Sequence, residues 1–76
     1  MKTLTVEPKG WPLRYYDCPP GLFIYVDTLC FRPEYDDDSF VVESGEAFWG
    51  GVPSKEARAE LIVQPCIAVW HKTESD

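Results

Sequence analysis

Proline and glycine interrupt this chain so often that only short elements of secondary structure can form between them. The 76 residues include seven prolines and five glycines. Proline removes a backbone donor, and glycine favours turns. Helix-forming residues follow one another only at 55–60, where Ser54 is placed to cap the first turn. The sequence therefore predicts an all-β chain with one short helix near residues 54–60.

The other apolar runs are rich in β-branched and aromatic residues, which favour strands. The predicted strands lie at about 3–7, 22–26, 29–32, 40–43, 47–49 and 61–69. The continuous apolar run at 22–26 predicts a strand buried on both faces. In 61–69 the odd positions are all apolar, which is typical of a strand with one buried face, although Pro65 interrupts it.

Five or six short strands separated by turns predict a mainly antiparallel meander that curls into a small barrel or roll. A flat sheet covered by the single helix is the alternative. The length predicts a single small domain, 1–76, with a proline-rich covering arm at 1–21 and a polar tail at 71–76. We expect Trp11, in the arm, to pack over an open end of the barrel. The expected core contains Phe23, Tyr25, Leu29, Phe31, Val42, Val63, Ile67 and Val69.

The net charge of the chain disfavours one class of partner. Thirteen acidic residues against seven basic ones give a net charge of −6, which disfavours direct binding to nucleic acid. No run of about 18 apolar residues occurs, so we expect no membrane span. We also expect no signal peptide at the N-terminus. Three cysteines, an odd number, favour a reducing cytoplasm.

Catalytic and metal sites are not expected. The only histidine, His71, lies five residues from Cys66, so on one strand their side chains would point to opposite faces. A zinc site made by His71 with Cys18, Cys30 and Cys66 would lack the closely spaced ligand pairs of structural zinc centres. We also expect no cofactor.

A carboxylate-based hydrolase is a further alternative. Glu34, Glu43 and Glu46 flank the predicted hairpin. A catalytic pair needs two carboxylates roughly 5–10 Å apart in a cleft. A chain of this size rarely provides such a cleft, so we rank this function third.

Two segments are candidate binding sites. The run from Glu34 to Asp38 is the densest cluster of charge, and it lacks the alternating pattern of a calcium loop. Such a turn presents negative charge to a basic partner. In the second segment, glycines flank an adjacent pair of aromatic residues, one of which we expect at the surface. The candidate binding residues are Glu34, Tyr35, Asp36, Asp37, Asp38, Glu46, Phe48, Trp49 and Gly50.

Four stretches of the chain resemble small uncharacterised proteins of tailed bacteriophages and prophages. They are Pro20-Gly21-Leu22-Phe23, the segment from Leu29 to Tyr35, the segment from Val42 to Gly51, and Leu61-Ile62-Val63-Gln64-Pro65. The resemblance covers roughly residues 20–70. It implies a short phage accessory protein made in the bacterial cytoplasm and directed at a host system, and it assigns no site residue.

These observations predict a non-catalytic protein-binding module, namely a phage-encoded inhibitor or modulator of a host protein. The acidic surface favours a basic or nucleic-acid-processing partner. The alternative is an oligomer that binds a nucleotide by stacking on Trp49 or Tyr35, with backbone donors near Gly50 and Gly51. Small size and an unpaired strand edge also predict a homo-oligomer, most simply a dimer.

Overall fold

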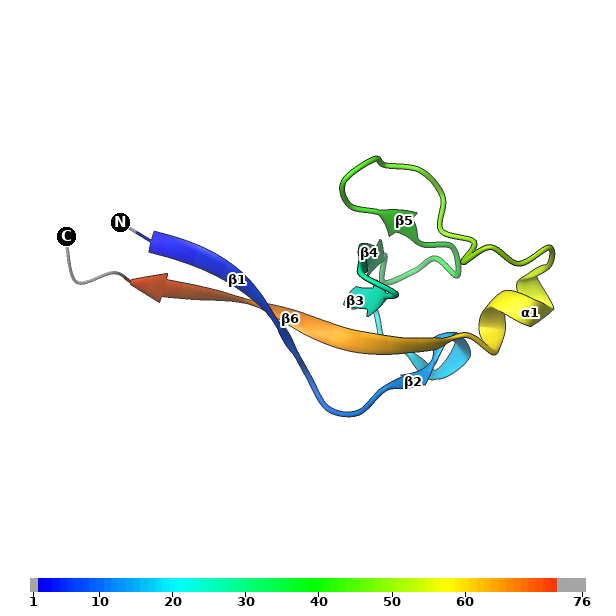
Figure 1. The fold of residues 1–76 in the computed structure, drawn as a ribbon, viewed down its shortest axis with the longest axis horizontal. Helices are drawn as coiled ribbons and strands as arrows, with labels where there is room; N and C mark the ends of the chain where they lie inside the picture. Colours follow the sequence, from blue (N-terminus) through cyan, green and yellow to red (C-terminus); the bar gives the residue numbers. More distant parts are fainter. Residues whose placement is uncertain (1, 73–76) are drawn as a thin grey trace.

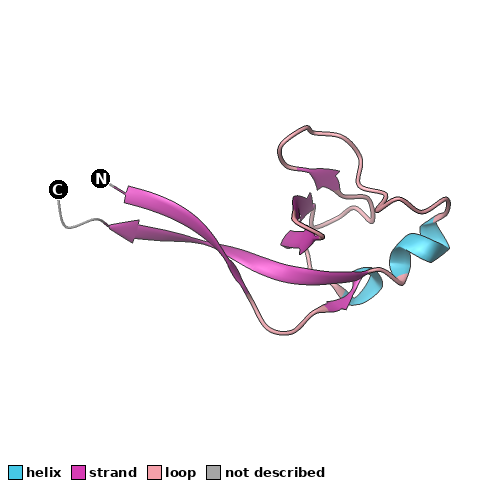
Figure 2. Cartoon of the chain, in the orientation of Figure 1, coloured by secondary structure: helices cyan, strands magenta, loops and turns pink. Residues whose placement is uncertain are grey.

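The computed structural model describes residues 2–72, which form an open antiparallel sheet with two short helices (Figures 1 and 2). The strands are β1 (Lys2–Pro8), β2 (Leu13–Arg14), β3 (Gly21–Tyr25), β4 (Thr28–Arg32), β5 (Phe40–Val41) and β6 (Ile62–Lys72). The helices are a 3-10 turn, η1 (Tyr15–Asp17), and α1 (Lys55–Ala59). The sheet order is β1-β6-β3-β4-β5, and β2 pairs with β6 beside β1.

The prediction of a mainly antiparallel β fold with one short helix is confirmed. Helix α1 begins where expected, because the Ser54 hydroxyl accepts a hydrogen bond from the Ala57 N–H at 3.2 Å. The sheet does not close, so the barrel is wrong. Closure would require β1 and β5 to meet. Instead β5 has only two residues, and β1 follows β6 away from the other strands.

The molecule has two parts, a ribbon and a body. β1 pairs with β6 over seven positions, from Lys2 opposite Lys72 to Pro8 opposite Cys66, whereas β3 pairs with β6 only at Gln64 and Pro65. Beyond Cys66 the sheet is therefore only two strands wide. This ribbon, residues 2–8 and 66–72, projects from the body, residues 9–65 (Figure 1). The principal extents of 48 × 25 × 24 Å follow from this shape.

The core lies in the body and is built from aromatic rings. The ring centroids of Phe23 and Phe48 are 5.2 Å apart, and Tyr15 lies 5.6 Å from each of them. Phe23 and Val63 are buried as predicted, and Tyr25 packs against the core from its edge. The core cluster consists of Tyr15, Cys18, Phe23, Cys30, Phe48 and Val63.

Several predicted core positions are wrong. Val42 and Ile67 are each 45% exposed, and Val69 is only half-buried. Ile67 and Val69 lie on β6 beyond the point where β3 leaves it, and no other layer of residues 2–72 covers them. Leu29 and Phe31 are half-buried on β4.

The predicted role of Trp11 is also wrong, since its side chain is 84% exposed. β1 and β2 pair with the same side of β6, with Pro8 opposite Cys66 and Leu13 opposite Val63. Residues 9–12, which connect β1 to β2, outnumber residues 64–65, which lie between the same two pairs on β6. The connection therefore bulges out of the sheet and exposes Trp11. Tyr15 and Cys18 cover the core instead.

The remaining strand predictions differ in extent. In β3 only Phe23 is fully buried, so the strand is not buried on both faces. The expected strand at 47–49 is reduced to a single bridge between Phe40 and Ala47. β6 runs through Pro65 and as far as Lys72, so it includes the start of the predicted polar tail. Residues 73–76 of that tail lie outside the described residues.

Candidate functional site

The acidic segment 34–38 forms an exposed loop between β4 and β5. The Asp36 carboxylate accepts a hydrogen bond from the Asp38 N–H at 2.9 Å, which closes a tight turn. The Tyr35 side chain is 95% exposed, and Glu34 is exposed beside it. These two residues and Asp36 therefore face solvent.

Two arginines of the body bind the other aspartates of this loop. Arg58 pairs with the Asp38 carboxylate at 2.9 Å, and Arg32 approaches that of Asp37 at 3.5 Å. The hydrogen bond from Arg58, together with the charge of Lys55, lowers the pKa of Asp38 below its ordinary value. Part of the negative charge that the sequence suggests for this loop is thus neutralised within the chain.

Arg58 organises the centre of the body. It is 3% exposed, and its guanidinium lies 5.2 Å from the Tyr15 ring centroid and 4.7 Å from that of Trp49. It also donates a hydrogen bond to the Phe48 carbonyl at 3.2 Å. Arg32 lies 5.4 Å from the Tyr15 ring. The sequence gives no signal for this arrangement, because the partners are far apart along the chain.

The two members of the aromatic pair have different places. Phe48 is 3% exposed and belongs to the core, whereas Trp49 is 41% exposed and rests on Arg58. Trp49 is therefore the member of the pair that lies at the surface, where one of the two was expected. Glu46 lies in the preceding turn with its side chain exposed, and its carbonyl accepts the Val41 N–H at 2.8 Å.

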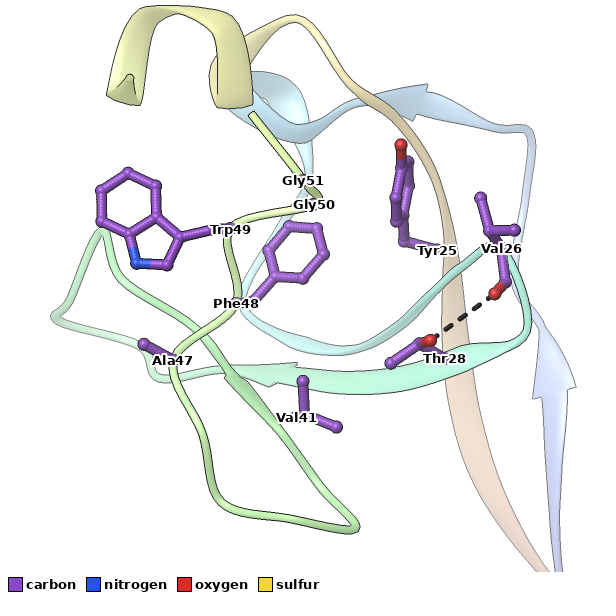
Figure 3. Close-up of a pocket in the computed structure, with 9 residues that line it drawn as sticks. All are labelled: Tyr25, Val26, Thr28, Val41, Ala47, Phe48, Trp49, Gly50 and Gly51. Carbon is purple, nitrogen blue, oxygen red and sulfur yellow. Dashed lines mark hydrogen bonds between the residues drawn. The ribbon is translucent and has the colours of Figure 1, made fainter. Parts of the chain in front are cut away.

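A largely apolar pocket of about 330 Å³ lies beside this segment (Figure 3). It is lined by Tyr25, Val26, Thr28, Val41, Ala47, Phe48, Trp49, Gly50 and Gly51. Gly50 has φ +66°, and a Cβ at this position would collide with the side chain of Leu61. The close approach that the sequence suggests for this glycine is therefore made by the chain itself.

The rim of the pocket includes a strained turn that the sequence analysis missed. The β3–β4 hairpin turns through Val26 and Asp27, with φ +44° and +63°. Two consecutive positive φ values are typical of a type I′ turn, which favours asparagine and glycine. A β-branched residue there is a conformational outlier. The Val26 side chain is 76% exposed and lines the pocket.

An acidic recess adjoins the apolar pocket. Its volume is about 270 Å³, and it shares Thr28 and Val41 with the pocket. Asp27 and Glu43 supply its charge. The apolar pocket and the cavity lined by the two acidic residues thus share two lining residues.

The structure brings together only some of the predicted binding residues. Phe48, Trp49 and Gly50 line the apolar pocket, whereas Asp37 lines a different pocket of about 420 Å³. Asp38 is linked to Trp49 through Arg58. Arg58 thus contacts both the acidic loop and the aromatic segment, but these two segments form separate surfaces.

The three thiols of the chain are buried. Cys18, Cys30 and Cys66 are free and buried, and burial raises the pKa of each thiol, that of Cys30 to about 11. High pKa values make weak nucleophiles at neutral pH. Within residues 2–72 no three His, Cys, Asp or Glu side chains gather as a metal site requires.

No helix in the described part of the chain is long and apolar enough to cross a membrane. No family model matches the chain, and neither a curated protein nor a solved structure matches it.

Proposed function

We propose that this chain is a non-catalytic protein-binding module whose binding site is the Trp49 pocket together with the acidic recess beside it. The observation that carries the proposal is the shared wall formed by Thr28 and Val41. A partner segment that inserts an apolar side chain into the pocket places a neighbouring lysine or arginine next to Asp27 and Glu43. The expected ligand is thus a basic protein segment with an apolar anchor.

Such a contact is energetically favourable both at the apolar pocket and at the acidic recess. Exposed aromatic residues beside a pocket are typical anchors of protein interfaces. Acidic groups speed the encounter with a basic partner, and burial of the anchor slows dissociation. The net charge of −6 adds to this steering.

The turn at Val26 supports the same location. Val26 adopts φ +44°, a conformation that costs stability for a β-branched residue. Its side chain gains little burial in the chain itself, being 76% exposed. An apolar group held at a pocket rim at such a cost is a candidate contact for a partner.

The resemblance to phage proteins bears on the partner and the compartment. We extend the proposal to a phage-encoded inhibitor or modulator of a host protein, acting in the bacterial cytoplasm. The acidic recess favours a basic target, such as a nucleic-acid-processing protein, over an acidic one.

Affinity capture from a bacterial lysate, with identification by mass spectrometry, tests the proposal. The wild-type chain is compared with Trp49→Ala and Val26→Asn, and Trp11→Ala is the matched control because Trp11 is an exposed aromatic residue outside the pocket. We expect a salt-sensitive partner that Trp11→Ala retains and both pocket variants lose. Val26→Asn separates binding from folding, because it removes a pocket contact while relieving the turn.

Two results would contradict the proposal. One is a partner that both pocket variants capture as well as the wild type does. The other is the absence of any specific partner. If instead Glu34→Gln with Asp36→Asn abolishes capture and the pocket variants do not, the binding surface is the acidic loop.

A second candidate function, nucleotide binding, is favoured by one observation. Arg32, Lys55 and Arg58 line the 420 Å³ pocket together with Tyr15 and Tyr16. Phosphate sites recruit such cations, and exposed tyrosine stacks on bases. We rank it second because both arginines already donate to backbone carbonyls and approach aspartates. A thermal-shift panel of mono-, di- and cyclic nucleotides tests it, and no shift at about 1 mM ligand would exclude it.

A further inference from the structure

One pocket of the body is lined mainly by basic side chains, although the chain as a whole is acidic. Arg32 of β4 and Lys55 and Arg58 of α1 line the pocket of about 420 Å³, and Asp37 is the one acidic residue of its lining. Charges more than about 10 Å away are largely screened at ordinary ionic strength, so the nearby cations decide what enters. We call this cavity the basic pocket.

The guanidinium of Arg32 is fixed in place at the wall of the basic pocket. Its Nη1 donates hydrogen bonds to the carbonyls of Cys18 and Tyr15, at 2.7 and 3.4 Å, and its side chain is only 17% exposed. Nη2 is left for the Asp37 carboxylate, whose Oδ1 lies 3.5 Å away. A guanidinium that is held in advance loses little conformational freedom when it binds an anion.

The Asp37 carboxylate is a weak partner for this guanidinium. The distance of 3.5 Å is long for a hydrogen bond, and the Asp37 side chain is 95% exposed, so the pair contributes little to stability. The backbone of Asp37 is held independently, because its carbonyl accepts a hydrogen bond from the Tyr15 hydroxyl at 2.7 Å. The carboxylate can therefore leave Arg32 while the backbone of the loop stays in place.

Two further donors of the lining residues have no acceptor within the described chain. The Nε–H of Arg58 is buried and has no hydrogen-bond partner among residues 2–72. The ammonium of Lys55 forms no ion pair with a carboxylate of the same residues. Buried donors are normally satisfied, so an unsatisfied one on a residue that lines a pocket points to an acceptor supplied by a ligand.

We propose that the basic pocket binds the phosphate group of a small phosphate monoester, and that this group takes the place of the Asp37 carboxylate on Arg32. A phosphate offers three oxygens and a charge of about −1.5 to −2, so it pairs with Arg32 and Lys55 together more strongly than one carboxylate does. Tyr16 lines the same pocket and is 72% exposed, so its ring can stack on the rest of the ligand. The inference rests on the second candidate function, nucleotide binding, and is independent of the Trp49 pocket.

Titration with AMP, followed by amide spectra in a buffer free of phosphate, tests the exchange at Arg32. The variant Asp37→Asn removes the competing charge without changing the shape of the side chain. Asp36→Asn is the matched control, because Asp36 lies outside the pocket and asparagine can still accept the hydrogen bond from the Asp38 N–H. We expect Asp37→Asn to lower the Kd for AMP about three- to fivefold and Asp36→Asn to change it less than about twofold.

The second cation is tested by Lys55→Gln. Lys55 is exposed, so the variant should fold, which circular dichroism checks. Lys9→Gln is the matched control, since Lys9 is an exposed lysine outside the pocket. We expect Lys55→Gln to raise the Kd for inorganic phosphate at least about threefold and Lys9→Gln to change it less than about twofold. Acetate, the carboxylate probe, should bind at least about tenfold more weakly than inorganic phosphate.

The possible failures of the inference and of nucleotide binding are distinguishable. If AMP binds the wild type and Asp37→Asn equally well, the exchange is wrong and nucleotide binding stands. If acetate binds as tightly as inorganic phosphate, the site is not selective for phosphate and the inference is wrong. If neither about 1 mM AMP nor about 10 mM inorganic phosphate shifts any amide of the pocket, the inference and the nucleotide function are both excluded.

Discussion

At the scale of single residues, Arg58 connects most of what holds the body together. It lies between the rings of Tyr15 and Trp49, bonds the Phe48 carbonyl and pairs with Asp38. The guanidinium of arginine suits this position because it is planar and carries several hydrogen-bond donors, so it stacks on rings and bonds to two acceptors at once. The ammonium of lysine cannot stack in this way or present two donors in a fixed plane. One buried side chain thus joins the helix, the acidic loop and the aromatic segment.

We expect Arg58→Ala to destabilise the chain by about 2–3 kcal/mol, because it removes two stacking contacts and leaves the buried Phe48 carbonyl without its donor. Urea unfolding measures the loss. Arg58→Lys should recover little of it. The control is Arg14→Ala, whose side chain is half-exposed and pairs with Asp17 at the surface, and we expect it to have little effect. An equal loss in both variants would contradict the assigned role.

At the scale of elements, the β3–β4 hairpin shows a local sequence that does not suit its turn. Strands 22–26 and 29–32 are evident from their composition, and the hairpin forms with Tyr25 opposite Thr28. The two residues between them must take positive φ, which valine disfavours. The tertiary pairing of both strands therefore imposes a conformation that the turn residues would not choose.

We expect Val26→Asn to stabilise the chain by about 0.5–1 kcal/mol, because asparagine tolerates positive φ and little apolar burial is lost. Thermal unfolding should show a rise of several degrees in Tm for a chain of this size. Val42→Asn is the matched control, since Val42 is an exposed valine whose φ is not positive. A lower Tm for Val26→Asn would show that the turn is not strained.

At the scale of the whole molecule, two of the three thiols lie in the body and the third lies where the ribbon joins it. Cys18 and Cys30 belong to the core, and Cys66 lies at the junction of body and ribbon. Burial raises the pKa of all three thiols. The free energy of unfolding is therefore expected to depend on pH in the alkaline range, where these thiols ionise more readily in the unfolded chain.

We expect the free energy of unfolding to fall between about pH 9 and pH 11. In the unfolded chain the Cys30 thiol ionises near its ordinary pKa of 9.0, whereas in the folded chain its pKa is about 11. In this window the unfolded state binds fewer protons, so rising pH favours it. The contribution of Cys30 is fully present below pH 9 and is lost as pH rises through 11. Its size is at most about 2–3 kcal/mol.

Urea unfolding at pH 8, 9, 10 and 11 measures this loss. The matched variant is Cys30→Ala, which removes the thiol and should show a shallower decline than the wild type. Parallel declines in the two proteins would exclude Cys30 as the cause.

Local chemistry was enough to predict several elements of this protein. The helix at Lys55–Ala59 follows from helix-forming residues behind a serine cap, and the β4–β5 hairpin follows from two apolar runs around an acidic turn. The sequence also indicates that one of the adjacent residues Phe48 and Trp49 lies at the surface, although not which one. These features depend on residues close together in the sequence, so local propensity is enough to predict them.

Which apolar residues are buried depends on contacts between segments that lie far apart in the sequence. Trp11 and Tyr15 lie in the same proline-rich arm. The Tyr15 ring is buried against Phe23 and Phe48, and its hydroxyl lies 2.6 Å from Ser39 Oγ. The pairing of β1 and β2 along β6 instead leaves Trp11 in an exposed loop. Likewise, the odd positions of β6 from Val63 to Val69 are all apolar, but only Val63 and Pro65, in the body, are buried, whereas Ile67 is exposed and Val69 is half-buried in the ribbon. Periodicity shows that a strand has an apolar face, whereas burial depends on which distant strand reaches it.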